Sequence, residues 1–198
     1  MPNNQICNCG EAKGFTPQHN RIAGGEEVGE HKYPWIVHVQ GRLPGSPGWR
    51  CTGALIDATH VITAAHCINH SKYDSFNPGD QPAAQHFRVL LGTNNYHNPH
   101  FSARPPARVS GLTVHPSYLE RDLLGHNVAV LTLSSPVLYS REIKPICLPS
   151  NPDQNYVGKV AVAAGFGVNV YNLTQDKLME STLLSSPKRS ASTVCMKI

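Results

Sequence analysis

The chain has 198 residues, of which 40% are hydrophobic, and a formal net charge of +4. A chain of this length and composition can bury one core or two small packed lobes, which excludes a disordered protein. The positive charge is spread along the sequence without a run of Lys or Arg, so we expect no nucleic-acid partner. No apolar run approaches the length of a membrane span, so we expect no membrane partner either.

Short apolar runs separated by turn residues favour strands over helices, and Gly and Pro each occur 16 times. Residues 1–21 are polar and irregular, and residues 69–85 read as a surface loop. The segment 176–186 fits either a short helix or a strand. Without an internal repeat, this succession is typical of a barrel or a sandwich. Strands or strand pairs are predicted within 34–40, 49–68, 86–95, 108–118, 127–133 and 158–170.

Cysteines and glycosylation sequons together indicate an extracellular protein. The chain has six cysteines, and the two sequons begin at Asn69 and Asn172. Disulfides persist in oxidising compartments, and N-glycans are added to secreted chains. The first ten residues lack the apolar segment of a signal peptide. We therefore expect a secreted glycoprotein whose leader peptide is absent from this sequence.

Six short motifs occur in a characteristic order: RIAGGEEV, CTGALI, VITAAHC, VHPSY, IKPICLP and VAAGFG. Their order and spacing resemble the trypsin-like (chymotrypsin-fold, S1) serine peptidase family, from Cys9 to about Cys195. The resemblance implies an all-β fold, a chymotrypsin-like double β-barrel whose first barrel is complete and whose second is incomplete. It divides the chain into a leader and activation segment, 1–21, and a peptidase domain, 22–198, that ends before the family's nucleophile.

The resemblance makes His66 of VITAAHC the general base of a catalytic triad. A serine hydroxyl is a weak nucleophile until a histidine takes its proton, and a buried carboxylate fixes the tautomer of that histidine. The family carries the carboxylate in a motif D-I-A-L, where this chain reads Asn127-Val-Ala-Val-Leu. We interpret Asn127 as a substituted triad position. Two alternatives stay open: a shifted alignment that uses Asp122, and a polar strand-edge residue without a role.

The nucleophile is the second departure from the family pattern. The family motif G-D-S-G-G does not occur in this sequence, and no G-x-S-x-G motif replaces it. Ser181, Ser185 and Ser186 lack the glycine neighbours that make a tight turn, so none of them is expected to act as nucleophile. The nucleophile serine is therefore expected to be absent.

The resemblance also implies a cleavage site and two disulfides. Arg21-Ile22 looks like the activation site of a zymogen, although the aspartate that would receive the new amine is missing. Cys51 and Cys67 resemble the bridge beside the catalytic histidine, and Cys9 and Cys147 resemble the bridge that tethers the leader. Cys7 and Cys195 remain unassigned, and a pair between them stays open.

No cofactor and no metal are expected. His66 has no further metal ligands at a suitable spacing, and the loop LGTNNYHNP lacks the carboxylates that calcium prefers. Two functions remain. The chain is either a non-catalytic pseudoenzyme of the family that binds protein or peptide ligands, or a fragment of an active secreted serine endopeptidase. We expect a monomer in both cases.

Overall fold

The structure is a computed structural model that describes residues 9–12, 25–68, 83–95, 105–118, 126–151, 153–167 and 175–185. The predicted cleavage site at Arg21 and Ile22 lies outside the described residues, as do the sequons at Asn69 and Asn172. The unassigned Cys7 and Cys195 also lie outside them.

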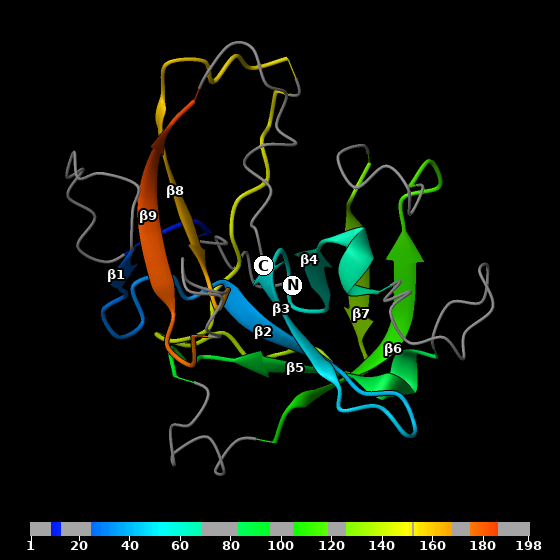
Figure 1. Ribbon diagram of the computed structural model, residues 1–198. Helices are drawn as coiled ribbons and strands as arrows, with labels where there is room; N and C mark the ends of the chain where they lie inside the picture. Colours follow the sequence, from blue (N-terminus) through cyan, green and yellow to red (C-terminus); the bar gives the residue numbers. More distant parts are fainter. Residues whose placement is uncertain are drawn as a thin grey trace, which may run out of the picture.

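Six antiparallel strands form a closed barrel in the order β2-β3-β4-β7-β6-β5 (Figure 1). The expected first barrel is therefore confirmed. Closure leaves no strand edge of this barrel unpaired, which removes the sites where sheets associate with other chains. The strands are β2 (Ile36–Gly41), β3 (Trp49–Leu55), β4 (His60–Thr63), β5 (Phe87–Leu91), β6 (Ala107–Val114) and β7 (Ala129–Leu133).

The barrel core follows from alternation along the strands. Successive side chains of a strand point to opposite faces, so every second residue enters the barrel. Val37 and Val39 of β2 are each 1% exposed, and Val89 opposite Val39 is fully buried. The fully buried side chains that complete this cluster are Leu55, Val61, Cys67, Ile68, Phe87 and Leu131. β-branched and large apolar residues favour such strands, because they pack well on a pleated surface.

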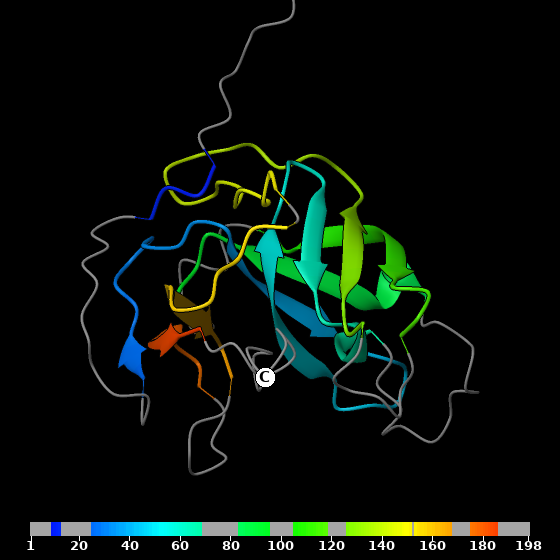
Figure 2. The same ribbon diagram turned by 90° about the horizontal axis from the view of Figure 1, so that it is seen from above.

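A second sheet has three strands in the order β1-β9-β8. They are β1 (Glu26–Glu27), β8 (Val160–Gly165) and β9 (Met179–Leu184). The sheet stands beside the barrel and does not close, as expected for an incomplete second barrel (Figures 1 and 2). The central part of the segment that fitted either a helix or a strand, Met179–Leu184, is a strand, because each of its residues pairs with β8.

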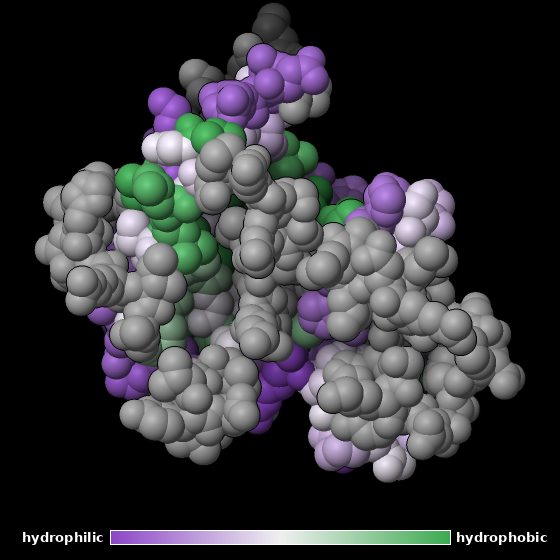
Figure 3. All heavy atoms as spheres, turned by 45° about the horizontal axis from the view of Figure 1, so that its top comes forward, coloured by the Kyte–Doolittle hydropathy of each residue, from purple (hydrophilic) through white to green (hydrophobic). Residues whose placement is uncertain are grey.

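Hydrophobic side chains reach the surface over this second sheet, where Figure 3 shows a green area. Val160 and Leu184 face each other across β8 and β9 and are 39% and 68% exposed. Within the ranges that the structure describes, the only helices are the three-residue 3₁₀ turns Ala65–Cys67 and Ala84–His86. No described helix is therefore long enough to cross a membrane.

An apolar cluster joins the barrel and the second sheet, with Ile36 and Ala54 on the barrel side and Val162 on the β8 side, and a polar and aromatic contact adds to it. The backbone N–H of Phe166 donates to Oγ1 of Thr52 in β3 over 3.0 Å. The ring of Phe166 stands edge-on to His38 of β2, with 5.1 Å between the ring centroids. His38 and Thr52 point outward from the barrel, yet they are only 2% and 1% exposed because the second sheet covers them.

We expect Gly41→Ala to destabilise the barrel. A Cβ at Gly41 would lie 2.3 Å from two atoms of the Trp49 indole, which is a rigid ring and not the flexible end of a long side chain. The indole is fixed, because its Nε1–H donates to the carbonyl of Cys67 and its ring packs edge-on against Phe87. Overpacking of this kind lowers the free energy of unfolding by about 2 kcal/mol. Urea unfolding measures the loss.

Gly29→Ala is the matched control, because a Cβ there meets no atom within 4 Å and the backbone has no positive φ. Its free energy of unfolding is expected to stay within about 0.5 kcal/mol of the wild type. Equal stability of the two variants would contradict the packing of Trp49 against Gly41.

Candidate functional site

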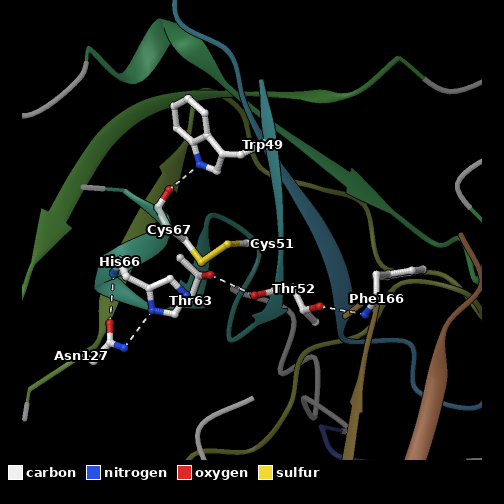
Figure 4. Close-up of a disulfide and its surroundings, with 8 residues drawn as sticks. All are labelled: Trp49, Cys51, Thr52, Thr63, His66, Cys67, Asn127 and Phe166. Carbon is white, nitrogen blue, oxygen red and sulfur yellow. Dashed lines mark hydrogen bonds between the residues drawn. A yellow bond between two sulfur atoms is a disulfide. The ribbon is translucent and has the colours of Figure 1, made fainter. Parts of the chain in front are cut away.

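His66 sits in a 3₁₀ turn whose last residue, Cys67, is fixed by two interactions (Figure 4). The turn, Ala65–Cys67, follows β4 directly and ends in the disulfide between Cys51 and Cys67. The Trp49 indole N–H donates to the carbonyl of Cys67 over 2.8 Å, and both partners are buried. Cys67, which directly follows His66, is therefore held by a covalent bond and by a buried hydrogen bond.

Asn127 reaches His66 because β4 and β7 are neighbours in the barrel. Thr63 at the end of β4 pairs with Ala129 at the start of β7. His66, shortly after β4, and Asn127, shortly before β7, therefore lie close together. Oδ1 of Asn127 lies 3.0 Å from the backbone N of His66, and Nδ2 lies 2.9 Å from Nδ1 of the His66 ring. The structure thus brings together His66 and Asn127, which the sequence motifs predicted to occupy two positions of a triad.

The amide orientation of Asn127 is fixed by the backbone of His66. A backbone N–H can only donate, so the Asn127 atom that faces it must be the oxygen. The NH₂ group then faces Nδ1 of the imidazole. Because an amide NH₂ can only donate, Nδ1 must be the acceptor and carry a lone pair. In the neutral ring the proton is therefore on Nε2.

The ring of His66 is neutral near pH 7. Burial lowers its pKa below the ordinary value of a histidine, because the charged form loses solvation. A neutral amide supplies none of the negative charge with which a carboxylate stabilises imidazolium.

A second histidine shows the opposite arrangement on the β3–β4 hairpin. Nδ1 of His60 lies 2.9 Å from Oδ2 of Asp57. Partial burial opposes ionisation of Asp57, but hydrogen bonds from Thr59 and His60 outweigh it and lower the pKa of Asp57. An ionised carboxylate only accepts, so Nδ1 of His60 carries the proton. This pair was not predicted from the sequence, although the spacing Asp-x-x-His around a turn is visible there.

The remaining site residues fall in several places. Cys9 and Cys147 form a disulfide, so residues 9–12 are tied to the segment after the barrel. Lys144 strengthens this attachment, because its Nζ lies 2.9 Å from a carboxylate oxygen of Glu11. Ser181 lies within β9, whose extended backbone offers no tight turn for a nucleophile.

The Cys51 and Cys67 sulfurs and a ring nitrogen of His66 lie within 4.8 Å of one another. Three such groups can hold a metal only when the cysteines are thiolates. Here the sulfurs are joined in a disulfide, so the cluster offers one imidazole nitrogen and no thiolate. It does not form a metal site in this state.

Comparison with known proteins gives a consistent picture. The family model "Trypsin" matches residues 22–194. Melanization protease 1 of Drosophila melanogaster is 30% identical over 193 residues, which cover 91% of this chain and 46% of the relative. Phenoloxidase-activating factor 3 of Holotrichia diomphalia is 30% identical over 166 residues, which cover 79% of this chain and 45% of the relative. This chain thus spans less than half the length of these curated relatives.

A solved structure described as GrC superimposes with a TM-score of 0.70 at 22% sequence identity. The match covers 88% of this chain and 70% of the solved one. At this identity the likeness supports the fold alone, and the fold is that of a chymotrypsin-like double barrel.

Proposed function

Because this chain belongs to the trypsin-like serine protease family, we propose that it is a non-catalytic member that acts by binding protein or peptide ligands. The family implies protein or peptide substrates. The proposed loss of catalysis rests on the two hydrogen bonds between Asn127 and His66. The contact between these two residues is the single observation that supports the proposal.

A general base must present a lone pair to the hydroxyl that it activates. In this family the aspartate holds the Nδ1 proton of histidine, so Nε2 is free to accept the serine proton. With the amide of Asn127 against Nδ1, the proton of neutral His66 is on Nε2 instead. In Ser-His-Asp proteases this exchange of aspartate for asparagine lowers turnover by about 10⁴ through the wrong tautomer.

The test uses a fluorophosphonate probe, which labels a serine only when a neighbouring base activates it. We expect the native protein, isolated with whatever chain it carries in its source, to stay unlabelled at a probe concentration that labels active trypsin completely. Hydrolysis of peptide amides should fall about 10⁴-fold below that of an active family member. Labelling of a serine at a rate comparable with trypsin would overturn the proposal.

A second candidate is an active serine endopeptidase of which this chain is one part. It is favoured by the length of the relatives, because this chain covers only 46% of Melanization protease 1 and 45% of Phenoloxidase-activating factor 3. Such an enzyme would have to work with Asn127 beside His66. The same probe separates the candidates, because an active peptidase is labelled and the binding protein is not.

We also propose that the protein is a secreted glycoprotein with a leader and activation segment, residues 1–21, that is cleaved from a domain that begins at Ile22. The two disulfides among the described residues support an oxidising compartment. Cleavage after Arg21 would leave the segment attached through Cys9 and Cys147. Peptide mapping of the native protein tests this, because cleaved material should separate into two chains only after reduction.

A further inference from the structure

Three arginines stand in one row on the outside of the barrel. Arg50 of β3 pairs with Gln40 of β2, Gln40 pairs with Arg88 of β5, and Arg88 pairs with Arg108 of β6. Residues directly opposite each other in an antiparallel pair project from the same face. The neighbouring row of Val39, Cys51 and Val89 points into the core, so this arginine row points outward.

The charges in this row are only partly balanced by the described residues. Arg50 forms an ion pair with Asp176, with 3.3 Å between Nη1 and Oδ1. Arg88 donates from Nη1 to the carbonyls of Gln85 and Phe87, which carry no charge. Among the described ion pairs none involves Arg88 or Arg108.

The two unbalanced arginines also face each other directly across the sheet. Like charges in such a cross-strand pair destabilise it. Arg88 is half-buried and Arg108 is exposed, so water screens the pair only in part. A barrel that served only as scaffold would gain stability from any uncharged or acidic residue at position 108, so the pair indicates a role outside the fold.

We propose that the arginine row, Arg50, Arg88 and Arg108 with Gln40 between them, is a docking surface for an acidic segment of a partner protein. Guanidinium groups bind carboxylates with two parallel hydrogen bonds, which gives both attraction and orientation. The row crosses three strand intervals, or about 14 Å, and an extended peptide of about four residues covers this distance. Gln40 offers both a donor and an acceptor to the peptide backbone in the middle of the row.

Two observations favour a short acidic peptide over a long sulfated polysaccharide. The row already receives a carboxylate, that of Asp176 on Arg50, so its geometry suits this group. The formal net charge of the whole chain is only +4, which gives a weak long-range field for a polyanion. The inference is independent of the proposed loss of catalysis, because no residue of the row contributes to the contacts between His66 and Asn127.

The test measures binding of a fluorescein-labelled oligoglutamate peptide to the full chain by fluorescence anisotropy, at neutral pH and low salt. We expect the double variant R88Q/R108Q to bind about tenfold more weakly, from a factor of about three for each exposed charge contact. The matched control R141Q/K159Q removes the same net charge from two exposed residues outside the row. It should change the affinity by less than about twofold.

The single variant Arg108→Gln is the control in case the double variant does not fold. Among the described contacts Arg108 makes no side-chain hydrogen bond that this variant would lose. It should weaken binding about threefold and raise Tm by about 2 °C, since the like-charge pair is removed. Equal losses in the two double variants would overturn the proposal, as would absence of oligoglutamate binding. A heparin oligosaccharide that binds through the row more tightly than oligoglutamate would also overturn it and would identify a sulfated glycan instead.

Discussion

Asn127→Asp is expected to move the proton of neutral His66 from Nε2 to Nδ1 and to raise the pKa of the ring. A carboxylate only accepts hydrogen bonds, so it would hold the proton on the nitrogen that it faces. Its negative charge would also stabilise the imidazolium form, which the neutral amide does not. In a complete triad this exchange is worth about 10⁴ in turnover.

The change can be followed on the ring itself. Diethyl pyrocarbonate acylates an imidazole nitrogen that carries a lone pair, and mass spectrometry of peptides locates the modified residue. In the wild type, Nε2 of His66 carries the proton and should react slowly. At a pH where the ring is neutral in both proteins, the reaction in Asn127→Asp should be at least about tenfold faster, the factor that corresponds to a preference of 1.4 kcal/mol for one tautomer.

His60 provides the matched control within the same molecule. Its Nδ1 already faces the carboxylate of Asp57, so its Nε2 should react readily in both proteins. Asp57→Asn reverses the experiment, because it places an amide beside His60 and should slow the modification of that ring. If Asn127→Asp left the reactivity of His66 unchanged, the orientation of the Asn127 amide would be contradicted.

Acid is expected to destabilise the protein through His38. Burial, together with the positive charge of Arg50, lowers the pKa of His38 to about 4, and the negative charge of Asp176 opposes this shift in part. The pKa of a free histidine is about 6.5. Between these values the unfolded chain binds a proton that the folded chain does not, so stability falls as the pH falls. The contribution is complete above pH 6.5, and about 3 kcal/mol of it is lost by pH 4.

Urea unfolding at pH 7 and at pH 4 measures this loss. His38→Gln removes the titrating group and should reduce the difference between the two pH values by about 3 kcal/mol. His60→Gln is the matched control, because His60 is half exposed and pairs with Asp57 away from the second sheet. A pH dependence that survives in His38→Gln would show that other groups, such as paired carboxylates, cause the acid instability.

The barrel was predictable because its strands carry strong local patterns. The apolar alternation around Val37 and Val39 and the run from Ala129 to Leu133 both indicate strands without tertiary information. The segment from Met179 to Leu184 was ambiguous, because Met, Glu and Leu favour helices as well. Its pairing with β8 decides the outcome, and two residues of β1 add to it on the other edge. Such long-range pairing leaves little trace in local composition.

In the candidate site, too, some features were predictable from the local sequence and others depend on the folded structure. The motif around His66 and the position of Asn127 were visible in the sequence. The orientation of the Asn127 amide was not, because it depends on where the backbone N–H of His66 points. The arginine row was also hidden, since its members are far apart in the chain and only the registers of four strands align them. A charge that looks diffuse along the sequence is concentrated on the folded surface.

The measurement that tests the central claim most directly is a ¹⁵N NMR spectrum of the histidine rings in the wild-type chain at neutral pH. The nitrogen shifts report which atom of each neutral ring carries the proton. We predict that Nε2 of His66 is protonated and that Nδ1 of His60 is protonated in the same sample. A proton on Nδ1 of His66 would leave Nε2 free to act as a base, and it would contradict the proposed loss of catalysis.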